Sequence, residues 1–262
     1  MFGLGRERRR RRLRKEPVPP AWQQIIARNL PFFHRLPAPD QRELLGHLQV
    51  FLAEKRLEGC AGLEVTDEMR VTIATQACLL LLHRKTNYFP RLLTILVYPS
   101  GYLVKENQPF SGAIWSEGHS GRLGETQRQM GSLVLAWDAA KEGGHDPADG
   151  KNLVIHEFAH QLDFEDFAAD GVPALASRDD VRAWSIVMRT EFSLLRASDE
   201  TGMPTLLDTY GATNPVEFFA VTTEAFFEQP HALRRLHPKL YGEMQRFFQQ
   251  DPAVYSSEEA RA

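Results

Sequence analysis

Three residues near the middle of the chain have the types and spacing of a metal-binding motif. The segment 152–163 reads NLVIHEFAHQLD and places His156, Glu157 and His160 in an H-E-x-x-H pattern. On an α-helix, residues four apart lie on one face, so the two imidazoles can converge on one ion. Imidazole nitrogen is a common zinc ligand, and Glu157 would lie about 100° around the helix, beside the ion. The motif therefore predicts zinc-dependent hydrolysis with Glu157 as the general base.

A catalytic zinc site also needs a third protein ligand and an open position for water. Asp163 shares a helix face with the two histidines, but it lies about 10.5 Å along the axis from His156. We therefore do not expect Asp163 on the ion; it could orient a ligand histidine, cap the helix locally or have no chemical role. The metzincin continuation also fails, because Asp163 stands where glycine would be and no third histidine follows at the required distance.

A downstream helix is the better source of the third ligand. The segment 210–230 reads YGATNPVEFFAVTTEAFFEQP, and Asn214-Pro215 marks a helix start because proline is favoured at the first helical position. Glu217 and Glu224 lie seven residues apart on one face of this apolar helix. A buried acidic pair is costly unless it meets a metal, a cation or hydrogen-bond donors. The alternative is a solvent-facing stripe on a surface helix, and the pattern alone does not separate the two glutamates.

The two segments HEFAHQLD and YGATNPVEFFAVTTEAFF together resemble the Mlc titration factor A family of bacterial zinc peptidases. They are more distantly similar to the catalytic domain of anthrax lethal factor. The resemblance runs from about Pro20 to Tyr255 and implies a zincin-like fold. It also implies a site with one zinc ion per chain, whose residues are the ligands His156, His160 and Glu217, the catalytic Glu157 and the assisting Tyr210.

The spacing between Tyr210 and Glu217 in this resemblance favours Glu217 over Glu224 as the ligand. Glu224 is then a candidate for holding the N–H of a ligand histidine. The hydroxyl of Tyr210 would donate to the developing oxyanion of the substrate. An extended peptide substrate could lie along the edge of a strand expected at Ser132–Trp137.

The resemblance implies a zinc peptidase; we expect the aminopeptidase type, although the sequence does not distinguish amino- from endopeptidase action. It also implies interaction with a transcriptional repressor of the Mlc type, in regulation of glucose uptake. The alternative is a regulatory protein without catalysis, which contains zinc and sequesters such a repressor. A zinc site open to water and turnover that depends on Glu157 would distinguish the enzyme from the binding protein.

The surrounding elements predict an α+β protein. Strand patterns occur in the middle of the chain, as two runs within Arg91–Val104 around a Pro-Ser-Gly turn and as Ser132–Trp137. Helix patterns and caps flank them on both sides. The expected helices are 21–29, 41–55, 67–82, 179–196, 215–228 and 238–248. Grouped strands with flanking helices predict a small mixed sheet rather than a wound parallel sheet.

The composition is that of a globular protein, with 43% hydrophobic and 25% charged residues and a formal charge of −3. The charge is uneven, because residues 1–15 hold eight Lys or Arg and one Glu. We expect residues 1–20 to form a solvated, disordered basic tail, residues 21–255 one peptidase domain, and residues 256–262 a second tail. Contact of the basic tail with nucleic acid, a membrane or the ribosome is the alternative.

The sequence shows no recognisable secretory signal, and its cysteines are expected to be reduced. Both features predict a cytoplasmic protein. No apolar stretch follows the arginines, which argues against a secretory signal. No window reaches the roughly 18 apolar residues of a membrane span, so we expect no membrane partner. Cys60 and Cys78 form no C-x-x-C motif and are expected to be reduced.

Overall fold

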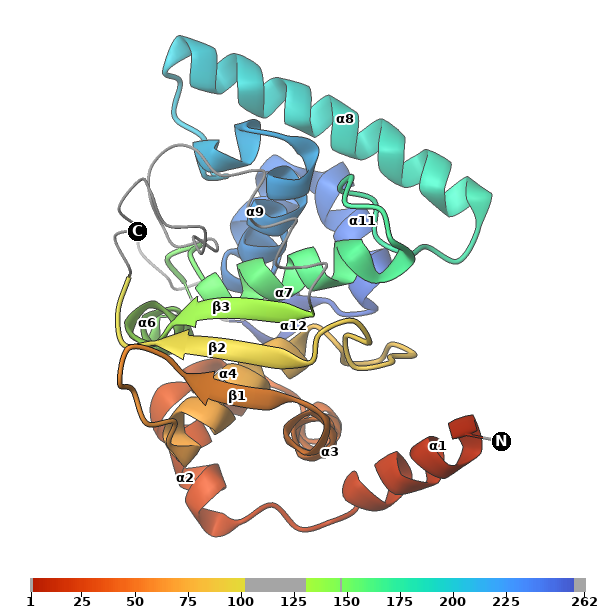
Figure 1. Cartoon of the computed structure of the whole chain (residues 1–262). Coiled ribbons are helices and arrows are strands. Elements are labelled where there is room, and N and C mark those ends of the chain that lie inside the picture. The colour runs from red at the N-terminus through yellow and green to blue at the C-terminus, as the bar shows by residue number, and fades with distance from the viewer. Residues whose placement is uncertain (1, 102–130, 147, 257–262) are drawn as a thin grey trace. The chain divides into compact units, whose positions relative to one another are not determined.

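The computed structural model describes residues 2–101, 131–146 and 148–256 of the chain (Figure 1). Most of these residues are helical, and three short strands form one sheet, consistent with the α+β class. Contacts within the chain group it into two compact units. Unit 1 comprises Met1–Leu81 and Thr86–His145, and unit 2 comprises Leu82–Lys85 and Asp146–Ala262. Residues 21–255, which we expected to form one peptidase domain, are therefore divided between the two units.

Unit 1 combines the sheet with helices. The helices are α1 (Phe2–Leu13), α2 (Pro20–Asn29), the 3-10 helix η1 (Pro31–Arg35), α3 (Ala38–Glu54), α4 (Asp67–Leu79) and α6 (Trp137–His145). The strands are β1 (Arg56–Gly59), β2 (Thr94–Tyr98) and β3 (Ser132–Ala136). They lie in the order β1-β2-β3 and both pairings are parallel, with Ile95 opposite Leu57 and Leu133. The expected mixed sheet is therefore a parallel sheet in the described residues.

Local sequence signals account for several of these elements. The hydroxyl of Thr66 accepts a hydrogen bond from the backbone N–H of Met69, which confirms the expected cap of α4. Strand β2 alternates between buried and half-buried residues, as a strand with one covered face does. The second strand run expected in Arg91–Val104 extends to residues 102–104, which lie outside the described residues.

The basic N-terminal segment differs from the expected disordered tail. Residues 2–13 form α1, and the side chain of Arg10 is only 5% exposed. Its guanidinium donates to both carboxylate oxygens of Glu54, at 2.8 and 2.6 Å, and to Asn87, and it lies 4.7 Å from the ring centroid of Tyr88. Partners distant in the sequence hold this arginine, and composition alone gives no sign of them. Arg8, Arg9, Arg11 and Arg12 remain exposed.

Unit 2 is helical in the described residues. Its elements are α7 (Leu153–Asp163), η2 (Phe164–Asp166), α8 (Arg178–Thr201), η3 (Thr209–Ala212), α9 (Pro215–Glu228), α10 (Pro230–Leu236), α11 (Pro238–Phe248) and α12 (Pro252–Tyr255). Helix α9 packs against α7, η3, α8, α10 and α11. Three of its four phenylalanines, Phe218, Phe219 and Phe226, are at most 1% exposed. The position of α9 is therefore set by its packing against the other elements of unit 2.

Two further expectations bear on the surroundings of the protein. No helix among the described residues is both long enough and apolar enough to span a membrane. Cys78 is buried and Cys60 half-buried, and neither forms a disulfide. The expected tail 256–262 lies outside the described residues except for Ser256.

Candidate metal centre

The start of α7 is fixed by Asn152. Its side-chain oxygen accepts a hydrogen bond from the N–H of Ile155 at 3.0 Å, a typical N-cap. Ten of the eleven residues of the helix are buried, and His156, with a side chain 14% exposed, is the exception. The apolar surroundings thus hold both His156 and His160 on a rigid element.

The start of α9 is fixed in the same way by Asn214. Its side-chain oxygen accepts from the N–H groups of Val216 and Glu217, at 2.9 and 3.0 Å, and Pro215 occupies the first turn. Glu217 therefore stands in the first turn of α9, where the positive end of the helix dipole favours a carboxylate. The Asn-Pro pair read from the sequence marks this boundary correctly.

The three predicted ligands meet between α7 and α9. One carboxylate oxygen of Glu217, Oε2, lies 3.1 Å from Nε2 of His156 and 3.2 Å from Nε2 of His160. Within the described residues, these three side chains are the group whose ligand atoms all lie within 4.8 Å of one another. Asp163 and Glu224 do not belong to this group.

This donor set suits a zinc ion. Ligand atoms about 2.0–2.2 Å from zinc are roughly 3.3–3.6 Å apart at tetrahedral angles, close to the two separations from Glu217. Two imidazoles and one carboxylate leave a fourth tetrahedral position for water or substrate. The three side chains could therefore hold a catalytic metal ion with little movement.

The electrostatics of the cluster also favour a cation. Burial lowers the pKa of His156, but Glu224 and the hydrogen bonds to Glu217 and Glu224 outweigh it and hold that pKa well above its ordinary value. Burial raises the pKa of Glu217, but His160 and His156 lower it overall. Both shifts show that positive charge between these helices is stabilised by the carboxylates around it.

Glu224 holds the opposite side of His156. Its Oε1 lies 2.7 Å from Nδ1 of His156, and its Oε2 accepts from the backbone N–H of Asn152 at 2.6 Å. A neutral His156 that donates from Nδ1 to Glu224 presents the lone pair of Nε2 to the other cluster residues. The contact is the one expected of a carboxylate that orients a metal ligand.

Two residues near the centre were not singled out from the sequence. Asn152 donates from Nδ2 to Oε1 of Glu228 at 3.0 Å, so it links α7 to the last residue of α9. Burial raises the pKa of Glu228 well above its ordinary value, and Glu224 and Asp149 add to this rise against the hydrogen bond from Asn152. The signals were present, because an asparagine preceding an apolar helix predicts a cap and Glu228 lies one turn beyond Glu224.

Glu157 and Tyr210, the two other predicted site residues, lie near His156. Glu157 is 5% exposed, and its charge is among the causes that raise the pKa of His156. Tyr210 is 46% exposed on η3, with its ring centroid 6.1 Å from that of His156. Asp163 is fully buried, and its Oδ2 accepts from the backbone N–H of Gly171 at 3.1 Å.

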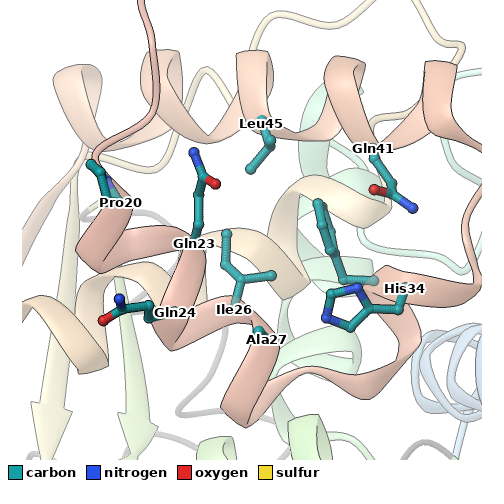
Figure 2. A pocket seen from close by; sticks show the side chains of 9 residues that line it. Pro20, Gln23, Gln24, Ile26, Ala27, His34, Gln41 and Leu45 are labelled. Carbon is teal, nitrogen blue, oxygen red and sulfur yellow. The ribbon is translucent and has the colours of Figure 1, made fainter.

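Unit 1 contains a cavity of about 530 Å³ with a different lining (Figure 2). Gln23 and Gln24 of α2, Gln41 of α3 and His34 of η1 supply its polar groups, beside apolar residues such as Ile26. No carboxylate lines it, so it lacks the donor set for metal-assisted hydrolysis. The chemistry points to the α7–α9 cluster instead.

Comparisons with known proteins agree with this geometry. A family model described as glucose-regulated metallo-peptidase M90 matches residues 4–249. The chain belongs to this metallopeptidase family. An uncharacterized protein of Synechocystis is 40% identical over 246 residues, which cover 94% of this chain and 90% of that protein. Mlc titration factor A of Yersinia pestis is 32% identical over 236 residues, which cover 88% of this chain and 84% of that protein.

The Mlc titration factor A of Yersinia pseudotuberculosis shows the same identity and coverage as that of Yersinia pestis. Membership in the M90 metallopeptidases confirms the resemblance inferred from the two sequence segments around His156 and Glu217. A metal ion is therefore expected in the protein, and the cluster of His156, His160 and Glu217 is the described group that could hold it.

Proposed function

We propose that the protein is a zinc-dependent peptidase of zincin-like fold, with His156, His160 and Glu217 holding one zinc ion per chain. The observation that carries the proposal is the convergence of both Nε2 atoms on Oε2 of Glu217, at 3.1 and 3.2 Å. When bound, zinc supplies a Lewis acid that polarises a carbonyl group and lowers the pKa of water.

Glu157 is the proposed general base. Its place next to His156 on α7 puts its carboxylate beside the ligand set rather than within it. The carboxylate accepts a proton from the attacking water and then donates it to the nitrogen of the leaving amine. Burial of Glu157 keeps this proton transfer away from bulk solvent.

Tyr210 is the proposed hydrogen-bond donor to the substrate. Its half-exposed ring, close to that of His156, leaves the side chain accessible to a bound peptide. A hydroxyl that donates to the developing oxyanion stabilises the transition state, and one such donor contributes about 2.7–4 kcal/mol. The substrate class we propose is a peptide, with cleavage of the aminopeptidase type.

The decisive experiment compares Glu157→Gln with the wild-type protein. The amide keeps the size of the side chain but cannot accept the water proton at neutral pH. We expect full zinc content and a loss of peptide hydrolysis of about 10²–10⁴-fold, measured with chromogenic amino-acid and peptide substrates. Glu200→Gln is the matched control, because Glu200 is 70% exposed on α8. Activity of Glu157→Gln within twofold of wild type would refute the assignment of Glu157 as the general base.

A regulatory role is a second candidate, and the name of the two Yersinia relatives, Mlc titration factor A, favours it. We propose that this protein, in the cytoplasm, also binds a transcriptional repressor of that type. Nucleic acid and membrane surfaces are not proposed as partners. Glu157→Gln separates the roles: undiminished repressor binding by the inactive variant would show that binding does not need catalysis.

A further inference from the structure

The role of Asp163 follows from its contacts rather than from the metal ligands. Asp163 is the last residue of α7, three positions after His160, and is fully buried. Its Oδ2 accepts a hydrogen bond from the backbone N–H of Gly171 at 3.1 Å. The carboxylate therefore ties the end of the histidine-bearing helix to the loop that follows η2.

Gly171 in turn touches the start of the helix that carries Glu217. Its φ is +79°, and a Cβ atom at this position would lie 2.4 Å from the carbonyl oxygen and 2.8 Å from the carbonyl carbon of Pro215. No side chain larger than hydrogen fits there without displacement of backbone atoms. Pro215 is the first residue of α9 and stands two positions before Glu217.

The other side of Gly171 is held by α8. The indole N–H of Trp184 donates to the carbonyl oxygen of Gly171 at 3.0 Å, and Trp184 is fully buried. The ring of Trp184 packs against Phe219, with centroids 5.6 Å apart. Gly171 thus contacts three helices: it accepts a hydrogen bond from Trp184 of α8, donates one to Asp163 of α7 and lies against the backbone of Pro215 of α9.

We propose that Asp163, Gly171 and Trp184 form a clip that sets the position of the Glu217 carboxylate relative to His156 and His160. The three are positioning residues and touch neither metal nor substrate. This inference rests on the metal centre proposed above. Ligand distances in zinc sites fall within about 0.2 Å of their usual values, so a displacement at Pro215 that moves Glu217 should weaken zinc binding.

The first test compares Gly171→Ala with Gly202→Ala by zinc titration against a competing chelator. Gly202 also has a positive φ, +65°, but a Cβ there meets no atom within 4 Å. Both variants therefore carry similar backbone strain, and only Gly171→Ala displaces Pro215. We expect zinc to bind Gly171→Ala about 10–100-fold more weakly and Gly202→Ala within threefold of wild type. Equal affinity in both variants would overturn the clip.

A second pair of variants addresses the hydrogen bond without adding any atom at Gly171. Asp163→Asn retains an oxygen that can accept from the N–H of Gly171, whereas Asp163→Ala removes it. We expect Asp163→Ala to bind zinc about tenfold more weakly than wild type. Asp163→Asn should bind zinc with an affinity close to that of wild type. The pair keeps the inference testable if Gly171→Ala does not fold. Equal losses in Asp163→Ala and Asp163→Asn would contradict the clip.

A third measurement separates positioning from general loss of stability. Copper(II) binds nitrogen donors more tightly than zinc, so it reports on the two histidines even in a Glu217→Ala background. If the clip acts through Glu217, Asp163→Ala changes copper affinity in the wild-type background and leaves it unchanged in Glu217→Ala. An equal loss in both backgrounds would mean that Asp163 merely supports α7. If wild-type protein takes up no zinc, the proposed metal centre itself fails, which is a different result.

Discussion

Each unit of the molecule buries a cluster of charged side chains, and the two clusters are built differently. In unit 1, Arg10 donates to both oxygens of Glu54, and the ammonium of Lys55 donates to the carbonyl oxygens of Phe89 and Leu92, at 2.7 and 2.6 Å. In unit 2, two imidazoles and the Glu217 carboxylate converge on one another. The first cluster pairs donors with acceptors, whereas the second brings three potential acceptors together.

The difference identifies which cluster can bind a ligand. A donor that already has its acceptors gains nothing from an added ion. Burial, together with the positive charges of Arg10 and Arg6, lowers the pKa of Lys55 to about 8 against the opposing effect of Glu54. Acceptors that face one another need a proton or a metal ion between them, because lone pairs that meet without one repel. Burial of charged groups therefore does not by itself indicate function. What indicates a ligand site is that the buried groups facing one another are all acceptors.

The largest expected effect is removal of one histidine ligand. His156→Ala and His160→Ala should each abolish stoichiometric zinc binding, because the described residues of α7 offer no replacement donor at the same position. Metal content after dialysis against a chelator, measured by atomic emission, checks this. His237→Ala is the control, since His237 pairs with Glu191 elsewhere in unit 2. One zinc per chain in either ligand variant would overturn the assignment.

The two glutamates of α9 provide a sharper comparison within the same cluster. Glu217→Ala should lose zinc outright, whereas Glu224→Ala should keep it with an affinity reduced about 10–100-fold, because Glu224 contacts Nδ1 of His156 rather than the shared point. Asp163→Asn should retain metal. Calorimetric zinc titration of the three variants gives the ranking. The assignment of Glu217 fails if Glu224→Ala is the variant that loses the metal.

How much of this site the sequence predicts depends on the distance between partners along the chain. His156 and His160 lie one helical turn apart, so their convergence follows from helix geometry alone. Glu217 lies 61 residues from His156, and sequence pattern left it level with Glu224 until a family resemblance separated them. The contact of Asp163 with Gly171 depends on a loop conformation with positive φ, which no helical pattern encodes.

The fold shows the same dependence. Helix α9 begins and ends as predicted, because Asn214-Pro215 and Pro230 are local signals. Helix α8 extends five residues beyond the expected end at Arg196, to Thr201, where Gly202 in the left-handed region terminates it. Strand β1 has no alternation of its own and forms through pairing with β2. Helices α6, α10 and α12 are short and were missed.

The cluster of unit 1 should affect stability and leave metal binding intact. Arg10→Ala removes the charged hydrogen bonds to Glu54 and should lower the free energy of unfolding by about 1.5–3 kcal/mol. Arg11→Ala is the matched control on the same helix, because Arg11 is 72% exposed and its ion pair with Glu7 contributes at most about 1 kcal/mol. Urea unfolding with zinc content measured in parallel checks both effects. Zinc loss in Arg10→Ala would contradict the separation of the two clusters.

The smallest expected effect concerns Glu228, which lies at the edge of the metal centre but outside the ligand set. Burial raises its pKa in the folded state, so the folded protein retains a proton that the unfolded chain releases above about pH 4.3. The folded state then binds more protons than the unfolded state, and stability falls as pH rises from that value toward the folded pKa.

Glu228→Gln removes this dependence, because the amide is neutral at every pH and its oxygen can still accept from Nδ2 of Asn152. We expect the variant to be more stable than wild type by on the order of 1 kcal/mol at pH 7, with the difference vanishing near pH 4. Urea midpoints at both pH values, with Glu200→Gln as the exposed control, measure it. A variant less stable than wild type at pH 7 would mean that the ionised carboxylate of Glu228 supports Asn152. Glu228 would then belong, like Glu224, to the residues that hold the first turn of α7 and its metal-binding face.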